Sequence, residues 1–296
     1  MKQLILTLTL LCSIFNSYTQ EEQFGWQPID TTVFVCQYDY YKRSILTPRK
    51  RDDMRLEIGH NLSKFYSQKT VDQLILSSTP EGRKIIGERT NDVFKRHAQA
   101  AAQGKSDAEK LLIMSEIPGL ASECIVYKNY PKGEMYVQDA AGRSLIGYYT
   151  DDYIPQDWQI EPDTMTYLGY HCQKATCTWR GRDYVAWFTP EIPVNDGPMK
   201  FFGLPGLIVK VADTDNAYSF ELKGIEKLNK PIYFNTKTFS KNYPDFEPTT
   251  RCEMLKKQSR SYKNRIRAIK RDMSRLGEST DDLDESMYDV QELDCK

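Results

Sequence analysis

The sequence predicts an α+β protein that is mostly β, with one large, curved antiparallel sheet, half-barrel-like, a helical insert and a C-terminal helix. Three observations predict this class. Short runs of alternating apolar and polar residues recur along most of the chain, and closely spaced turn residues separate them, as in antiparallel strands. The 19 tyrosines suit the half-buried faces of a sheet. Helical spacing of apolar residues is confined to two segments.

The strands are predicted in order from these alternating runs. The first covers residues 31–42 and the second residues 54–68, with a bend at Gly59. Short runs between residues 122 and 152 predict a meander, and hairpins follow over 165–190 and 206–228. We therefore expect about eight to ten strands, a number common in open or partly closed sheets. The strand order and the expected curvature favour a half-barrel like that of periplasmic lipoprotein carriers.

Two segments have the periodicity of helices. An insert in the β-rich domain (residues 20–249) is predicted to be helical at about residues 70–115, with breaks near Thr79-Pro80 and Gly104. A basic amphipathic helix is predicted over residues 250–277, ended by Gly277 and carrying a solvated basic face. Residues 278–296 form an acidic tail, which we expect to be mobile or to lie against the basic helix.

The N-terminus predicts export. Lys2 precedes an apolar run from Leu4 to Phe15, and small and polar residues follow, as in a secretory signal peptide over residues 1–19. We expect the rest of the chain to reach the periplasm with no transmembrane segment, because no other apolar run is long enough. Cys12 does not favour a lipid anchor, since Leu11 precedes it where such anchors need a small residue.

Cleavage of the signal peptide would remove Cys12 and leave an even number of cysteines. In an exported protein an even number favours disulfides, although spacing alone selects no pairing. The candidate disulfide residues are Cys36, Cys124, Cys172, Cys177, Cys252 and Cys295. His171 with Cys172 and Cys177 resembles part of a metal site, but the further ligands that a closed zinc site needs are missing. We therefore predict no metal and no cofactor.

A stretch rich in glycine and proline runs from Ala186 to Val211 between two predicted strands. Proline fixes φ and glycine permits close backbone approach, so this apolar stretch is expected to hold one rigid shape. It is either a plug of the core or the edge of an apolar groove that receives a ligand or peptide. The candidate ligand-binding residues are Trp187, Phe188, Phe202, Gly203, Leu204, Pro205, Gly206 and Leu207.

No catalytic residue is predicted. The chain has no G-x-S-x-G nucleophile elbow, and its three histidines leave little material for histidine catalysis. Glu191 and Asp196 flank the proline-rich stretch and could act as an acid/base pair, but two carboxylates in a polar loop are usually only solvated. A net charge of -1 argues against a protein that binds nucleic acid by neutralising phosphates.

The hexapeptide GLPGLI stands unaltered at residues 203–208. Together with VYKNYPKGEMYV at 126–137 and the run from Leu168 to Pro198, it resembles the GLPGLI family of exported proteins from Gram-negative envelopes. The resemblance covers most of the mature chain and is strongest from Cys124 to Leu228. Met199-Lys200-Phe201 departs from the family pattern, in which an aromatic residue precedes the lysine. The resemblance implies a place near outer-membrane transport genes, and it supplies no catalytic residues.

We therefore expect a non-enzymatic periplasmic binding or accessory protein of the cell envelope. Its expected partner is an outer-membrane transporter or another envelope protein, with an apolar ligand or peptide in the groove. The alternatives are a periplasmic hydrolase or thiol-redox enzyme, and a metal-handling protein. The binding-protein hypothesis predicts no free cysteine, whereas a thiol enzyme would need a reactive one.

Overall fold

The computed structural model describes residues 26–42, 50–114, 116–117, 124–141, 146–235, 246–275 and 292–295. The predicted signal peptide, Gly277 and the acidic tail up to residue 291 lie outside the described residues. No helix in the described part of the chain is both long and apolar enough to cross a membrane.

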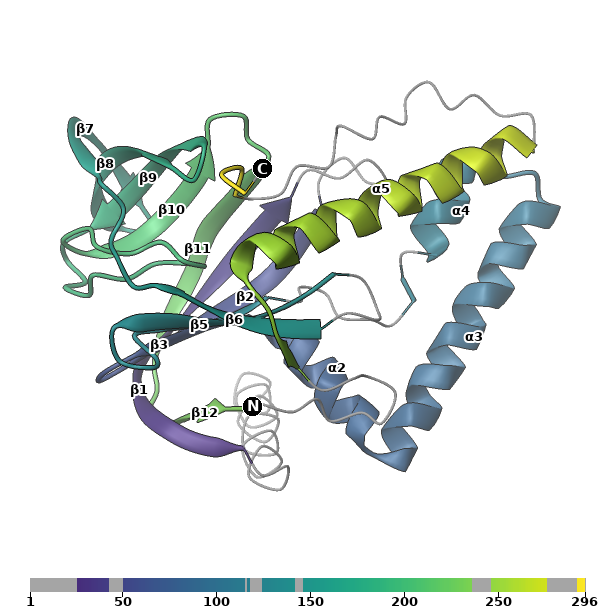
Figure 1. The fold of residues 1–296 in the computed structure, drawn as a ribbon, viewed down its shortest axis with the longest axis horizontal. Helices are drawn as coiled ribbons and strands as arrows, with labels where there is room; N and C mark the ends of the chain where they lie inside the picture. Colours follow the sequence, from purple (N-terminus) through teal and green to yellow (C-terminus); the bar gives the residue numbers. More distant parts are fainter. Residues whose placement is uncertain are drawn as a thin grey trace, which may run out of the picture.

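Thirteen strands form one sheet that is not closed (Figure 1). All of its pairs are antiparallel except the parallel pair of β6 with β13. The strands are β1 (Gln27–Lys42), β2 (Lys50–Gly59), β3 (Ser63–Ser67), β4 (Ile125–Lys128), β5 (Glu134–Ala140), β6 (Ile146–Asp152), β7 (Gln159–Tyr167), β8 (Tyr170–Trp179), β9 (Arg182–Thr189), β10 (Leu207–Asp213), β11 (Tyr218–Lys227), β12 (Pro231–Phe234) and β13 (Glu247–Pro248).

Two meanders make up the sheet. Strands β1 to β6 lie in sequence order on one side, and strands β7 to β11 on the other. The long strand β1 pairs with both β2 and β11 and so joins the meanders, while β12 pairs with the N-terminal part of β1. Sequential strands are therefore neighbours nearly everywhere, as the closely spaced turn residues predict.

The predicted second strand is in fact two strands. β2 and β3 form a hairpin in which the Gly59 N–H donates to the Leu62 carbonyl at 2.9 Å. The Asp30 carboxylate of β1 accepts from the N–H groups of Asn61 and Leu62 at 2.7 and 3.2 Å. A partner distant in sequence thus holds this turn. The strand pattern alone could not show that partner, and it therefore predicted only a bend at Gly59.

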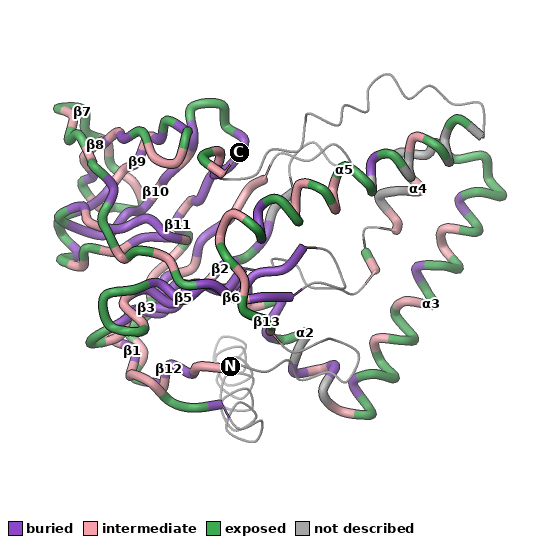
Figure 2. The backbone as a smooth tube through the Cα atoms, in the orientation of Figure 1, coloured by how far each residue is buried: buried purple, intermediate pink, exposed green. Residues whose placement is uncertain are grey.

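Alternation along the central strands builds a core on each face of the sheet. In β3, Phe65 belongs to one buried cluster and Tyr66 to the other, and Val126 and Tyr127 of β4 divide in the same way. Figure 2 shows these strands as almost continuously buried. The Phe65 cluster also draws on both β6 and β8, which a flat sheet would separate by about 40 Å at about 4.8 Å per strand. The sheet therefore curves around this cluster, as expected.

Three helices form the predicted insert between β3 and β4: α2 (Gln68–Ser78), α3 (Pro80–Ala102) and α4 (Asp107–Met114). Thr79 separates the first two, and its hydroxyl accepts from the Gly82 N–H at 3.0 Å to cap α3, with Pro80 in the first turn. Gly104, just past the end of α3, has a φ of +66°. Both predicted breaks are confirmed. Most of α3 is not buried, and the Phe94 side chain is 50% exposed.

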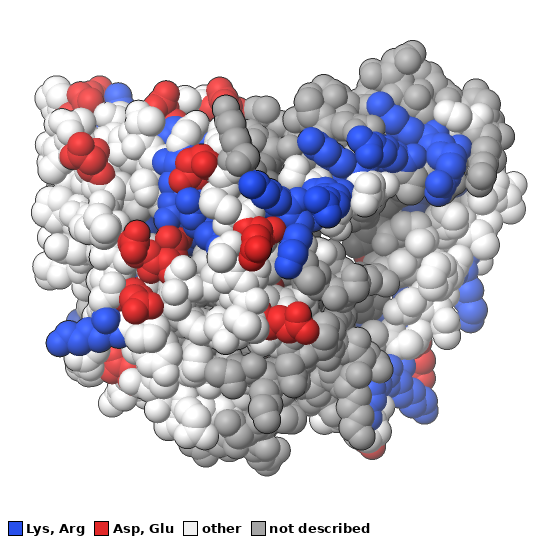
Figure 3. All heavy atoms as spheres, viewed as in Figure 1, with Lys and Arg blue, Asp and Glu red and all other residues white. Residues whose placement is uncertain are grey.

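The C-terminal helix α5 (Arg251–Arg275) lies across β5 and β6 (Figure 1). Thr250 and Glu253 cap it reciprocally, each accepting at 3.2 Å from the backbone N–H of the other. Met254 is buried over Gly147, where a Cβ would come within 2.9 Å of the methionine methyl group. Lys and Arg side chains gather along the outer side of α5 (Figure 3), so the predicted basic face is exposed.

Candidate functional site

The connection between β9 and β10 (residues 190–206) fills the concave side of the sheet. Phe201 and Leu204 are 0% and 1% exposed and belong to the same cluster as Phe65. The connection is tied to the loop before β7: the Gln156 amide donates to the Lys200 carbonyl at 3.2 Å, and the Trp158 indole N–H donates to the Phe202 carbonyl at 3.0 Å. The glycine- and proline-rich stretch therefore has one fixed conformation, and its interior serves as a plug of the core.

Five of the eight candidate ligand-binding residues lie in this connection, and Trp187, Phe188 and Leu207 lie in the flanking strands β9 and β10. Trp187 and Gly203 are half-buried and Pro205 is exposed, while the remaining five are buried. Those five are Phe188, Phe202, Leu204, Gly206 and Leu207. Of the eight, only Pro205 is fully presented to solvent, and ligand binding at these positions stays a prediction.

A buried ion pair anchors the plug to the first meander. The ammonium group of Lys128, at the end of β4, contacts the Asp196 carboxylate and donates to the Gly197 carbonyl at 2.5 Å and the Phe201 carbonyl at 3.4 Å. The Lys128 side chain is 1% exposed. Burial lowers the pKa of Lys128, and the charge and hydrogen bond of Asp196 oppose that shift. The ion pair thereby joins two parts of the chain that are 68 residues apart.

Replacing Gly206 with alanine is expected to destabilise the protein by about 2–4 kcal/mol. Gly206 has a φ of +154°, and an added Cβ would lie 2.2 Å from the Thr189 carbonyl oxygen, so the turn into β10 would have to move. The measurement is the free energy of unfolding in urea. Gly87→Ala in α3 is the matched control, because nothing lies within 4 Å of an added Cβ there and alanine favours a helix. Equal stabilities of the two variants would contradict this account.

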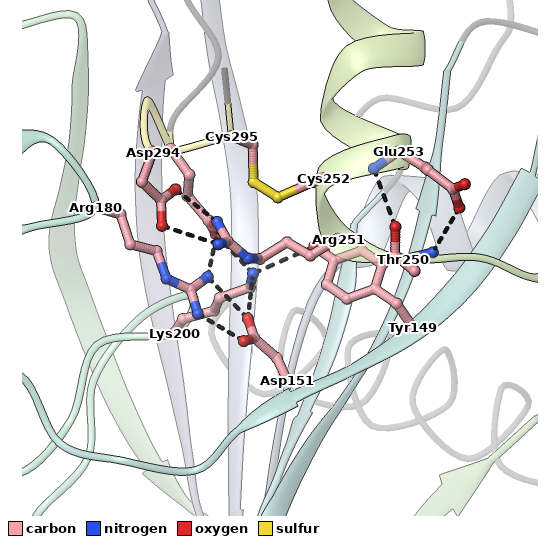
Figure 4. The surroundings of a disulfide bond; sticks show 11 residues. Tyr149, Asp151, Arg180, Lys200, Thr250, Arg251, Cys252, Glu253, Asp294 and Cys295 are labelled. Atoms are coloured by element: carbon pink, nitrogen blue, oxygen red, sulfur yellow. Dashed lines mark hydrogen bonds and ion pairs between the residues drawn. A yellow bond between two sulfur atoms is a disulfide. The ribbon is translucent and has the colours of Figure 1, made fainter.

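A second charged group lies where β6, the plug and residues 292–295 meet. We call it the Lys200 cluster and define it as Lys200, Asp151, Arg180, Arg251 and Glu292, the first four of which are labelled in Figure 4. The Lys200 ammonium pairs with Asp151 at 2.9 Å and with Glu292 at 2.6 Å. Arg180 pairs with Asp151 at 2.6 Å and with Glu292 at 2.5 Å, and Arg251 pairs with Glu292 at 2.7 Å. One carboxylate, that of Glu292, is therefore held by three cations.

The C-terminal segment (residues 292–295) is docked on this cluster through each of its residues. The Leu293 N–H donates to the Arg180 carbonyl at 2.8 Å. Both Asp294 oxygens accept from the Arg251 guanidinium, at 2.7 and 2.8 Å. Cys295 forms a disulfide with Cys252 of α5 (Figure 4). The segment thus follows one defined path from the sheet to the start of α5.

The electrostatics of the cluster keep its carboxylates ionised. Burial would raise the pKa of Glu292, but the charges of Lys200 and Arg180 more than offset burial, so the pKa of Glu292 lies below its ordinary value. The pKa of Asp151 is lowered in the same way, against burial, by hydrogen bonds and charges of Arg180 and Lys200. Asp139 of β5 behaves differently, because burial dominates and raises its pKa to about 6.

Asp139→Asn is expected to flatten the pH dependence of stability between about pH 4 and pH 6. The raised pKa means that the folded state keeps a proton that the unfolded state loses in this range, so wild-type stability falls as the pH rises through it. The variant lacks this loss because the asparagine side chain does not titrate. Its amide oxygen can still accept from the Ala140 N–H. Between pH 4 and pH 7.5, the free energy of unfolding of the variant should rise by about 2 kcal/mol relative to that of the wild type, as measured by urea unfolding. Parallel pH profiles would refute the assignment.

The structure bears out one pair of the disulfide candidates and corrects the other four. Cys252 and Cys295 form a disulfide. Cys36, Cys124, Cys172 and Cys177 are buried thiols. All four belong to the apolar cluster that contains Phe65. The expectation that these four cysteines form disulfides is therefore wrong: they are buried residues of the apolar core instead.

The described residues do not form the metal site or the acid/base pair that were considered from the sequence. His171 is exposed, and its backbone N–H donates to the Glu191 carboxylate at 2.7 Å. Asp196, the second carboxylate of the acid/base pair that was considered and not predicted, is in contact with Lys128. In the described part of the chain no three His, Cys, Asp or Glu side chains lie together in a way that could hold a metal ion.

Sequence reasoning missed both charged groups. Lys200 carries a signal that could have been read, because a lysine between Met199 and Phe201 in an apolar stretch is a candidate buried charge. Asp151 and Glu292 carry none, since each stands among polar residues and acquires its role from a partner far away in sequence.

One comparison with known proteins, that with family models, concerns the same part of the chain. Residues 180–210 match the model of a protein family of unknown function, Porph_ging. The matched residues contain the plug, Lys200 and Arg180. Among curated proteins there is no significant match. Two solved structures of PNGF-II, in the C2 and P21 space groups, are similar at 12% and 11% identity with TM-scores of 0.46 and 0.47. The alignments cover 79% of this chain, which spans about a third (34%) of the PNGF-II chains.

Proposed function

We propose that this protein is exported to the periplasm and acts there as a non-enzymatic binding or accessory protein of the cell envelope, in line with its resemblance to the GLPGLI family. The observation that carries the proposal is the docking of residues 292–295. The fold holds this peptide segment through a buried carboxylate, a backbone hydrogen bond and a two-point contact of Asp294 with Arg251. These are the interactions by which binding proteins hold peptides.

The cysteines support export and oppose thiol chemistry. The Cys252–Cys295 disulfide fits an oxidising compartment. The thiols are buried, and burial raises the pKa of each of them, to about 12 for Cys177. Because the thiolate is the nucleophile, these cysteines are poorly suited to redox or nucleophilic catalysis. The binding-protein hypothesis predicted no free cysteine, and this prediction is wrong because Cys36, Cys124, Cys172 and Cys177 are free. Their raised pKa values still oppose a thiol enzyme.

The partner that we propose is an outer-membrane transporter or another envelope protein. The test is capture from an envelope extract with the full chain, followed by mass spectrometry of the bound proteins and small molecules. A binding protein is expected to return its ligand with unchanged mass after prolonged incubation. A component of the extract that is converted with time by the purified protein would overturn the proposal in favour of an enzyme.

A further inference from the structure

We propose that Lys200, Arg180 and Arg251 form a receptor for an acidic peptide with carboxylates at positions i and i+2, and that Glu292 and Asp294 occupy it in cis. We further propose that the Cys252–Cys295 disulfide controls whether a peptide from another molecule can take their place. This inference rests on the proposed binding function and names its ligand class.

The charges of the site call for an anionic occupant. The sheet and α5 supply three cations, Asp151 supplies one carboxylate that pairs with them, and Asp139 supplies a second nearby, so at least one positive charge remains for the docked segment to balance. With the segment docked, Lys200 is 0% exposed, so its ammonium group depends on protein partners for its hydrogen bonds. The groups that face Lys200 besides its carboxylates are the Tyr149 hydroxyl, at 3.2 Å, and the nearby Asp139 carboxyl. Leaving the cations unpaired would be costly, which favours a carboxylate ligand strongly.

The contacts also favour a peptide over a free anion as the ligand. The Arg180 carbonyl accepts from the Leu293 N–H at 2.8 Å, which fixes the backbone between the two carboxylates. Leu293 packs on Gly181, where an added Cβ would lie 2.9 Å from the Leu293 Cβ. Arg251 holds Asp294 at two points, and such a guanidinium fork is geometrically selective for a carboxylate. The site therefore recognises a sequence of acid, apolar residue and acid.

The disulfide lies directly beside these contacts. Cys252 follows Arg251 and Cys295 follows Asp294, so the covalent bond closes next to the ion pair of their neighbours. While the bond is intact, the effective concentration of the cis segment is too high for competition. A dithiol reductant would open it by exchange: the two protein sulfurs become thiols, and the reductant becomes a cyclic disulfide. The cis segment would then be held by non-covalent contacts and could be displaced.

The test uses the full chain and a fluorescein-labelled synthetic peptide of residues 289–296 with serine in place of cysteine at position 295. In anisotropy titrations we expect no binding to the oxidised wild type. We expect weak binding to Cys252→Ser/Cys295→Ser, and binding at least about ten-fold tighter when Glu292→Gln/Asp294→Asn is added. Adding Arg251→Gln to that variant, or replacing the two peptide residues that correspond to Glu292 and Asp294 by their amides, should weaken binding by about ten-fold or more. Equal binding of the acidic and amide peptides would overturn the proposal.

A second measurement avoids variants that could fail to fold. In the wild-type protein reduced with a dithiol, an excess of the acidic peptide should accelerate hydrogen exchange of the Leu293 amide, and the amide peptide should not. Unchanged exchange of Leu293 overturns the receptor proposal. If envelope capture nevertheless returns an unchanged ligand, the proposed binding function stands and only its ligand class is wrong. Turnover of a ligand in the capture experiment would reject the binding function itself.

Discussion

Replacing Lys128 with methionine is expected to destabilise the fold by about 3–5 kcal/mol. Methionine fills much of the same space, but it leaves the Asp196 carboxylate without its cation and the Gly197 and Phe201 carbonyls without their donor. Breaking a buried pair by removing one partner is costly because the remaining charge is not resolvated. The measurement is the free energy of unfolding in urea at pH 7.

Two further variants make this prediction specific. Lys174→Met removes a lysine whose ion pair with Asp163, at 3.8 Å, is partly exposed, and it should cost less than about 1 kcal/mol. Combining Lys128→Met with Asp196→Asn should cost less than the sum of the two single substitutions, because the second removes the charge that the first leaves unpaired. A cost for Lys128→Met no larger than that of Lys174→Met would show that the plug is not anchored by this lysine.

Lys200→Met is expected to have a similar effect, about 3–5 kcal/mol at pH 7. The lysine is the shared cation of Asp151 and Glu292, whose side chains are 7% and 5% exposed. Because its charge holds the pKa of Glu292 below the ordinary value of 4.5, the stabilisation is present above that pH and is lost as the pH falls through the lowered pKa. The difference between variant and wild type should therefore shrink under acid conditions.

Urea unfolding at pH 7 and at a series of pH values below 4.5 tests both parts of this prediction. Lys256→Met is the matched control, since this lysine lies on the exposed face of α5 and its replacement should change stability by less than about 0.5 kcal/mol. A loss of stability in Lys200→Met that stays constant with pH would mean that the lysine acts by packing and not by pairing with carboxylates.

The fold class follows from local patterns that the structure confirms. Alternation and turn residues predicted an antiparallel sheet. The prediction succeeded because strands that follow each other in the sequence are neighbours in both meanders. Apolar spacing and the break at Thr79-Pro80 predicted the helices for the same reason: both are local signals, and the Thr79 cap that the structure shows also lies within one turn of the residue it satisfies. The strand between residues 54 and 68 was misjudged at the one place where Asp30, distant in sequence, holds the turn.

The candidate site could be predicted only in small part. The glycine- and proline-rich stretch is largely buried, and its rigidity stays a prediction from its composition. Its anchor is Lys128, which in the sequence looks like an ordinary lysine at the end of a strand. The cysteine count was a sound guide to the disulfide between Cys252 and Cys295 and a poor one to the remaining four cysteines. A free cysteine is also a good core residue, and sequence alone does not separate that use from pairing.

By itself, the sequence determined the β-rich architecture, the helical insert, the basic C-terminal helix and a stiff segment between two strands. Tertiary structure alone decided which charges are buried, which cysteines pair and where the C-terminal segment docks. The physical reason is one of range. Secondary structure is set by spacing over a few residues, whereas the contact of Lys200 with Glu292 joins positions 92 residues apart and exists only once the sheet has curved.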